Sequence, residues 1–521
     1  MKFFEKNKRI IIALILGCLP LLYAILRPFF DGHSLNSVWI GASEWNDELF
    51  YFKQVDAMVK YGIPQGYFGF NESHGLYLTF AAWSPVLLMP WALFGKIFGF
   101  SMITPVVVNI IMLSVAMFLF GFYAKLDYVK TAMAAVLFFL FVPFSRYLLS
   151  GMPEIIVISL LLIVTALMVG YDEDGVDRGK YGKIIAMFIL LFLLTLMRPY
   201  LIMFMIVPVF YLVRKTKHGY WISPIVVVAT LFVYLIINKA FGAPYFTPLY
   251  RTDWLKAFIN QGFAGGVLET LRTLKQYGYN VTLNMIDGVV NGLCPGAYFV
   301  THCMFIGIFF IDFIMKLVKK EKGRFISFTM LFTNLGMFFA ILLMYKLFEG
   351  SKHLLTFIAV DIFVMVAVVN LRKVFSAVLA VSFIWLYMIR ALSDYDYAVP
   401  YRDETHEEIA ELSKEIAPDM ILTGDVSWDN TVALVFYDTD KYSGEAVMTA
   451  WQQLYAIPAG YGISFCTDEY LLENMSDLKC KYLVSPADGV VGDTAINKGA
   501  TVVGENNKVK IIDLSTMRIY E

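Results

Sequence analysis

Residues 10–26 read IIIALILGCLPLLYAIL, a run of apolar and small residues without a single charge. A segment of this length and composition is typical of a helix that crosses a lipid bilayer. Similar runs recur along the chain, which has 521 residues, 59% hydrophobic and 16% charged. Soluble domains are nearer half apolar and a quarter charged. The composition therefore predicts a polytopic α-helical membrane protein.

The remaining composition excludes several other classes. The formal net charge is −1, so electrostatics do not support a nucleic-acid partner. The five cysteines lack a metal-binding spacing, and Cys466 and Cys480 are candidates for a disulfide only if their domain lies outside the cytoplasm. The basic start MKFFEKNKR resembles a signal peptide, but RPFFDGH follows the apolar run in place of a cleavage motif. We therefore expect an uncleaved first span.

The apolar segments predict the topology. They lie at about 10–26, 79–98, 103–122, 131–149, 155–170, 184–197, 200–213, 220–241, 297–315, 325–345, 354–370 and 374–392. Basic residues are concentrated at the N-terminus and in the loops at 124–130, 177–183, 214–218, 316–324 and 370–373. These loops all fall on one side only if segment 79–98, which Pro85 and Pro90 interrupt, is interfacial or re-entrant. About eleven spans then remain, with the N-terminus in the cytoplasm and the C-terminus outside.

Two domains follow from this topology. A transmembrane domain at 1–393 carries two large outer loops, at 27–102 and 242–296, and polarity rises from 394 to 521. The polar region predicts a small extracytoplasmic α/β domain. Its expected elements are a helix near 404–417 and strands at 420–425, 431–438, 481–486 and 508–514. We interpret this domain as a folded lid or binding appendage, because it contains no nucleophile elbow, phosphate loop or metal spacing.

The stretch SEWNDELFYF at 43–52 places acids in the first outer loop. Residues 48–62 have a helical pattern with one apolar face, which predicts a helix lying in the membrane interface. Asp47 and Glu48 are then either first-turn acids of this helix, capped by Asn46, or functional carboxylates. A positioned general base contributes about 10²–10⁴-fold in rate.

Further polar residues reach the same predicted side. Glu154 follows Pro153 at the start of a span, Arg198 separates two short apolar helices, and Lys352-His353 lies in a late loop. Each has a structural explanation: a first-turn acid, a snorkelling arginine and a solvated loop. Together, however, acids suit deprotonation of a hydroxyl or cation binding, and basic groups suit a phosphate. The set predicts transfer of a group from a lipid phosphate to an acceptor outside the cytoplasm.

These motifs resemble the GT-C superfamily of membrane glycosyltransferases, which includes protein mannosyltransferases and aminoarabinose transferases. The resemblance covers roughly 1–393. Asn46-Asp47-Glu48 resembles the family's acidic motif in the first outer loop, Glu154 its second outer acid, Arg198 its phosphate-binding residue and Ser351-Lys352-His353 its late-loop motif. Many relatives have Asp where Glu154 stands, and Arg more often than Lys-His in the late loop.

The resemblance implies inverting transfer of a hexosyl or pentosyl group from a polyprenyl-phosphate donor to a saccharide, lipid or protein acceptor at the cell envelope. Asp47 would be the base, and Arg198, Lys352 and His353 would hold the donor phosphate. Asp47, Glu48 and Glu154 are also candidate ligands of Mg²⁺ or Mn²⁺, which prefer oxygen. The alternatives are a polymerase or ligase of lipid-linked polysaccharide, a flippase or transporter of such lipids, and a non-catalytic scaffold. The clustering of charges at one face disfavours a transporter, whose sites lie near the midplane.

Overall fold

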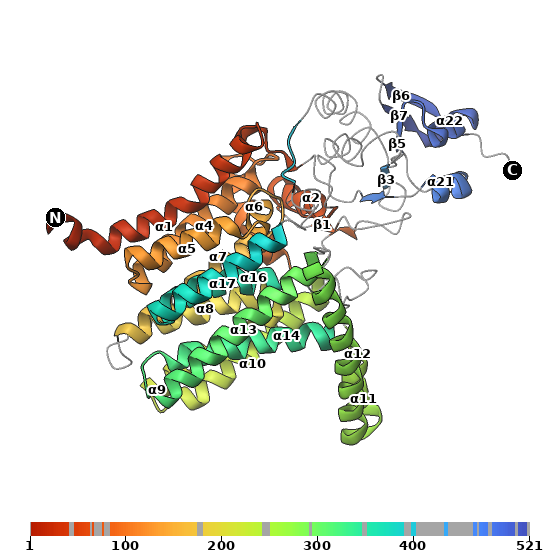
Figure 1. The fold of residues 1–521 in the computed structure, drawn as a ribbon. Helices are drawn as coiled ribbons and strands as arrows, with labels where there is room; N and C mark the ends of the chain where they lie inside the picture. The colour runs from red at the N-terminus through yellow and green to blue at the C-terminus, as the bar shows by residue number, and fades with distance from the viewer. Residues whose placement is uncertain are drawn as a thin grey trace.

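A bundle of apolar helices makes up most of the structure (Figure 1). The computed structural model describes residues 2–40, 46–62, 65–66, 76–77, 84–174, 181–241, 251–290, 294–345, 352–389, 398–402, 432–435, 462–465, 468–477, 482–505 and 509–517. Within these ranges, six helices are long and apolar enough to cross a membrane, so the chain is an integral, multi-pass membrane protein. They are α1 (Lys2–Phe30), α4 (Thr104–Ala124), α7 (Glu154–Asp174), α10 (Gly219–Phe241), α13 (Cys294–Val318) and α14 (Arg324–Met344).

Shorter helices occupy the other predicted spans. They are α5 (Tyr128–Leu140), α6 (Pro143–Leu148), α8 (Tyr181–Met197), η4 (Pro199–Met205), α9 (Ile206–Lys215), α16 (Leu354–Val368) and α17 (Leu371–Ile389). The expected polytopic helical architecture is thus confirmed. The segment 131–149 differs in detail, because it breaks into α5 and α6. Pro143 disfavours a helical conformation in the residue before it and begins a new helix itself.

The elements between α1 and α4 are short. They are η1 (Leu35–Ser37), α2 (Asn46–Tyr61), β1 (Gln65–Gly66), β2 (Leu76–Tyr77), η3 (Pro85–Leu88) and α3 (Met89–Phe98). The predicted helix at 48–62 corresponds to α2. The ten residues of α3 span about 15 Å, half of a hydrocarbon core about 30 Å thick. With η3 directly before it, α3 forms one apolar helical segment, Pro85–Phe98, that is shorter than the six long spans.

Two helices occupy the predicted loop at 242–296. They are α11 (Asp253–Asn260) and α12 (Gly262–Val290). The sequence reasoning assigned no secondary structure there, because the apolar positions of α12 alternate with many polar ones. The described part of the connection between α10 and α13, residues 251–290, is therefore largely helical.

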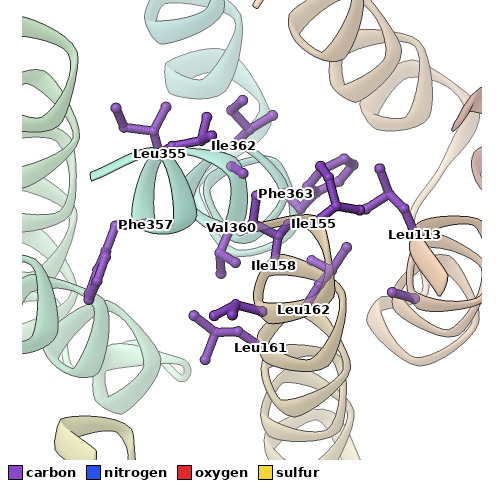
Figure 2. Close-up of a cluster of buried hydrophobic side chains, with 14 of the residues drawn as sticks. Leu113, Ile155, Ile158, Leu161, Leu162, Leu355, Phe357, Val360, Ile362 and Phe363 are labelled. Atoms are coloured by element: carbon purple, nitrogen blue, oxygen red, sulfur yellow. The ribbon is translucent and has the colours of Figure 1, made fainter. Parts of the chain in front are cut away.

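The centre of the bundle is formed by α7 and α16, which pack against each other (Figure 2). Every residue from Leu354 to Val366 in α16 is buried. The apolar window of α7 is 89% buried, whereas that of α10 is only 11% buried. A helix that is apolar on all sides belongs in the centre of a bundle or in lipid. Burial therefore places α7 and α16 inside and α10 at the lipid-facing edge.

Basic side chains gather at the end of the bundle where α1 begins, which we call the basic end. Arg9 donates a hydrogen bond to a carbonyl near the end of α4. Lys130 donates to the carbonyl of Ala367, and Lys316 donates to that of Val368, each at 2.9 Å. The positive-inside rule predicts the cytoplasm on this side. We call the opposite end, where α2 begins, the α2 end.

The C-terminal region contains a five-stranded sheet in the order β4-β3-β5-β7-β6. β3 runs parallel to β4 and β5, whereas β7 runs antiparallel to β5 and β6. Its elements are β3 (Val432–Val435), β4 (Gly462–Phe465), α21 (Asp468–Asn474), β5 (Tyr482–Pro486), α22 (Val490–Asn497), β6 (Thr501–Glu505), β7 (Val509–Asp513) and η6 (Leu514–Thr516). The expected α/β domain is confirmed, with β4 and β6 in addition to the predicted strands. The helix expected near 404–417, the strand expected at 420–425 and the pair Cys466 and Cys480 lie outside the described residues.

A short ladder joins the chain after α17 to the segment that leads into α2. Val38 forms an antiparallel bridge with Tyr401, and the Trp39 amide donates to the Pro400 carbonyl at 3.0 Å. The ring of His33 stacks on that of Tyr401 at 4.0 Å between centroids. The segment between α1 and α2 is thereby held by residues that follow α17.

Candidate active site

The two acids at the start of α2 have different partners. Asp47 Oδ2 accepts a hydrogen bond from Lys352 Nζ at 2.7 Å, and each side chain is about one-third exposed (35% and 32%). Glu48 Oε1 lies 2.7 Å from Arg146 Nη2, and both of these side chains are buried. Successive helical residues point about 100° apart, since a turn takes 3.6 residues. The first turn of α2 therefore directs its two carboxylates to two separate places.

Glu48 belongs to the packing of α2 rather than to an accessible site. Its second oxygen accepts the Gly151 amide at 3.2 Å, in the connection between α6 and α7. A Cβ at Gly151 would lie 3.0 Å from Ile40 and 3.3 Å from the Glu48 Cβ, so glycine permits this close approach. The expectation that Glu48 is catalytic or faces a metal is not met by these contacts. Its buried ion pair with Arg146 fixes the start of α2 against the bundle.

Asn109 of α4 also holds the connection between α6 and α7. Its amide oxygen accepts from the Trp91 indole, and its amide nitrogen donates to the Ser150 carbonyl, each at 3.1 Å. The Ser150 hydroxyl donates to the Tyr147 carbonyl at 2.8 Å. All of these groups are buried, where an unmade hydrogen bond costs about 1–3 kcal/mol. The network fixes the backbone immediately before Glu154.

Glu154 and Arg198 form a second ion pair, which is fully buried. Arg198 Nη2 donates to Glu154 Oε1 at 2.8 Å, with 1% and 2% of the side chains exposed. Glu154 is the first residue of α7, and Arg198 lies in extended conformation between α8 and η4. Pro199 disfavours helix at the preceding residue, which explains the break at Arg198. The predicted acid and arginine thus meet at the α2 end.

His353 adjoins these pairs at the N-terminus of α16. Its Nδ1 lies 3.3 Å from the hydroxyl of Tyr200, which follows Arg198 by two residues. The ring of Tyr345, at the end of α14, lies 5.1 Å from the His353 ring. All six predicted site residues therefore lie at the α2 end of the bundle. Five of them interact with one another, whereas Glu48 is paired with Arg146.

The pKa values of Lys352 and His353 are shifted in opposite directions. Burial opposes the charge of Lys352, but the carboxylates of Asp47 and Glu154 outweigh it and raise its pKa above the usual value. Burial, then the positive charges of Arg198 and Lys352, hold the pKa of His353 well below its usual range. Lys352 is therefore cationic and His353 neutral near pH 7. A neutral imidazole offers one N–H donor rather than a charge.

Tyr51, Tyr200 and Tyr345 are part of the cluster and were missed from the sequence. Burial, followed by the charge of Asp47, raises the pKa of the Tyr51 hydroxyl well above the usual value, so it is a donor at neutral pH. Tyr51 follows Asp47 by four residues, the spacing that places two side chains on one helix face. That signal was available, whereas nothing local marks Tyr345.

The residues present do not fit a metal site made of Asp47, Glu48 and Glu154. Each carboxylate has its own basic partner: Lys352 for Asp47, Arg146 for Glu48 and Arg198 for Glu154. Within the described ranges, no three His, Cys, Asp or Glu side chains group as metal ligands. The three-acid ligand set expected from the sequence does not come together.

A second polar group lies at the middle of the bundle. Asn334 of α14 donates to Asp361 Oδ1 of α16 at 2.9 Å, and its carbonyl lies 3.0 Å from His302 Nε2 of α13. All three residues are fully buried. Asp361 is the central residue of α16, so the ionisable residues are not confined to one face of the membrane domain, contrary to the expectation from the sequence. An aspartate within the apolar run LLTFIAVDIFVMVAV was the available signal.

No protein-family model matches the chain, and no curated protein is significantly similar to it in sequence. Among solved structures, it is similar to crystal structures of ArnT from Cupriavidus metallidurans in the apo state and bound to undecaprenyl phosphate. Each of the two is 10% identical to this chain in sequence, with a TM-score of 0.39. The match to the apo structure covers 96% of this chain and 97% of the ArnT chain, and the match to the bound structure covers 95% and 97%. Similarity this distant assigns no function, which must come from the contacts of the site.

Proposed function

We propose that this chain is a membrane glycosyltransferase that moves a hexosyl or pentosyl group from a polyprenyl-phosphate donor to a saccharide, lipid or protein acceptor. The observation that supports this most is the Asp47–Lys352 pair, partly exposed, beside the buried Glu154–Arg198 pair. Carboxylates and cations brought together at the end of an apolar bundle suit a substrate with a lipid tail and a phosphate headgroup. We place this end on the extracytoplasmic side of the plasma membrane, because the basic end fits the cytoplasm.

The proposed reaction is a single inverting displacement. The bond between the sugar C1 and the phosphate oxygen breaks, and its electron pair stays on the polyprenyl phosphate. The acceptor hydroxyl oxygen bonds to C1 from the opposite face and loses its proton to the Asp47 carboxylate. Arg198, held by Glu154, and Lys352 would neutralise the charge that grows on the phosphate. The neutral imidazole of His353 would donate one hydrogen bond.

The Asp47–Lys352 pair supports a coupling between donor binding and the base. Lys352 Nζ lies 2.7 Å from Asp47, and a donor phosphate would compete for the same ammonium group. Movement of Lys352 from Asp47 to the phosphate would leave the Asp47 oxygen that Lys352 now contacts open to the acceptor hydroxyl only when the donor is bound.

Replacement of Asp47 by Asn tests the proposal. We expect sugar transfer to fall by about 10²–10⁴-fold, since the amide cannot accept the proton. The assay is release of polyprenyl phosphate and labelling of acceptor by membranes that contain the full chain. Asp493→Asn, which removes an exposed pair with Lys510 in the C-terminal region, is the matched control. Full activity of Asp47→Asn, with normal insertion, would reject Asp47 as the base.

The buried group at the middle of the bundle favours a second candidate function, movement of a lipid-linked saccharide across the membrane. Asp361 and His302 lie where transporters place polar binding residues. The two candidates differ in which substitution stops them. Loss of lipid translocation in Asp361→Asn, with full activity in Asp47→Asn, would support transport; the opposite result supports glycosyl transfer.

A further inference from the structure

The hairpin of α11 and α12 is a two-helix unit that extends beyond the bundle. The ring of Phe258 in α11 lies directly on Gly266 of α12, where a side chain would collide with it. Ala257, the residue before Phe258, is buried. Among the described apolar side chains of the hairpin, those that pack on the core of the bundle are Leu274, Tyr277, Val281 and Met285. Residues before Leu274 are therefore held chiefly by the contact between the two helices.

The far part of the hairpin exposes a large apolar surface. Its exposed apolar side chains are Leu255, Ile259, Phe263, Val267, Leu268 and Leu271. Ile259 is 83% exposed and Phe263 80% exposed. At 100° per residue, the four α12 members of this set lie within one arc of the helix. Soluble surfaces rarely expose a contiguous patch of this kind.

The other side of the hairpin is polar. Exposed charged and amide side chains there are Asp253, Lys256, Arg272 and Gln276. Lys275 lies within the apolar arc, between Leu271 and Leu268, and its long aliphatic chain allows the ammonium group to reach a polar phase. An apolar arc opposite a charged one is the pattern of a helix that lies in a membrane interface.

Arg251 fixes the level of the hairpin along the bundle. Its amide donates to the Met344 carbonyl at 2.5 Å, and its guanidinium donates to the Tyr345 carbonyl at 2.6 Å. The guanidinium carbon also lies 3.3 Å from the centroid of the Tyr277 ring. The hairpin is therefore joined to the end of α14 that lies beside His353. Figure 1 shows α12 crossing the ends of α13 and α14 at a steep angle, with α11 beyond them.

We propose that the α11–α12 hairpin lies in the lipid interface on the α2 side of the bilayer, with its apolar arc in the acyl chains and its charged arc in the headgroups. The lipid surface of the bundle is continuous with it. Phe339 of α14 is exposed five residues before Met344, whose carbonyl holds Arg251, and α10 is exposed along its length. Lipid is the apolar phase that already covers these neighbours. This inference does not depend on the proposed enzymatic activity.

Site-directed fluorescence tests the proposal in the full chain. Cysteine replaces Phe263 or, separately, Leu268, in a background in which the native cysteines are serine. Each variant is labelled with bimane and reconstituted in phosphatidylcholine vesicles. We expect brominated phosphatidylcholine to quench both labels several times more strongly than aqueous iodide does. Two positions on the same arc keep the test open if one variant fails to fold.

Matched controls define the two phases. Arg272→Cys lies on the charged arc of the same helix, and Val503→Cys lies on an exposed strand of the C-terminal region. We expect iodide to quench these labels more strongly than brominated lipid does. The proposal is overturned if iodide reaches position 263 as well as position 503. It is also overturned if neither quencher reaches 263 and the shielding is lost when the protein is diluted in lipid, because another copy of the chain would then cover the arc.

Discussion

Lysine side chains lie at both ends of α16, but the helix dipole favours them at one end and disfavours them at the other. At its C-terminal end, Lys130 and Lys316 donate to the last carbonyls of the helix, where its dipole favours cations. At its N-terminal end, Lys352 lies where the dipole disfavours a cation, and it is balanced by Asp47 from another helix. The basic end therefore follows the local preferences of a helix, whereas the α2 end opposes them. Departures from local preference are expected at functional sites.

Among the comparisons between the two ends, removal of both charges at the buried α2-end pair should have the largest effect on sugar transfer. Arg198→Gln alone leaves Glu154 buried without its partner, so the double variant Glu154→Gln/Arg198→Gln is the informative one. We expect about 10²–10³-fold slower sugar transfer in the double variant, because the phosphate loses a fixed donor. Transfer assays and thermal melting of the same preparation measure this. Recovery of activity in the double variant would mean that Arg198 serves only the packing.

The equivalent experiment at the basic end should change stability and not catalysis. Lys316 Nζ donates to Asp312 at 2.6 Å within the buried pair, so Lys316→Met leaves Asp312 without that partner. We expect the free energy of unfolding to fall by about 3–5 kcal/mol. Asp312→Asn/Lys316→Met should recover most of this loss. Thermal melting in detergent is the measurement. A loss of sugar transfer per folded molecule would show that the basic end also affects catalysis.

The low pKa of His353 predicts how pH affects stability. Below the unfolded value of about 6.5, the unfolded chain binds a proton that the folded chain does not. Stability from this group is therefore complete above that value and is lost as pH falls below it, by at most about 1.4 kcal/mol per pH unit. Melting temperature measured against pH should fall less steeply in His353→Gln than in the wild type. Equal slopes would show that His353 is protonated in the folded protein.

The smallest effect is expected at Lys130. Its ammonium group is half-buried and donates to the carbonyls of Ala367 at 2.9 Å and Val369 at 3.4 Å. Lys130→Met should lower the free energy of unfolding by about 0.5–1.5 kcal/mol, the usual net value of a hydrogen bond. Sugar transfer should be unchanged. Lys352→Met is the counterpart at the α2 end, where we expect the reverse: little loss of stability, because the pair is one-third exposed, and a large loss of activity.

Several features of the fold were predictable because they depend on local composition. The apolar runs identified every long helix of the bundle, and the helical pattern after Asp47 identified α2. The break of 131–149 at Pro143 was also visible in principle. The hairpin of α11 and α12 was not predicted, because an interfacial helix has neither a continuous apolar run nor a strongly polar composition.

The site was predictable as a set of residues but not as a set of pairs. Position in the topology placed Asp47, Glu154, Arg198 and Lys352-His353 at the ends of helices on one predicted side. Nothing in that placement distinguished Asp47 from its neighbour Glu48. The distinction depends on Arg146 and on the close approach that Gly151 permits.

By itself, the sequence determined the membrane-protein class, the helices and the end of the bundle at which the charged residues collect, since hydropathy and charge act over short distances along the chain. The tertiary structure alone decided which charges meet. Asp47 and Lys352 are separated by 305 residues, and Glu154 and Arg198 by 44. Their pairing depends on how α2, α7 and α16 pack, and only that packing leaves one carboxylate in the first turn of α2 accessible and buries the other.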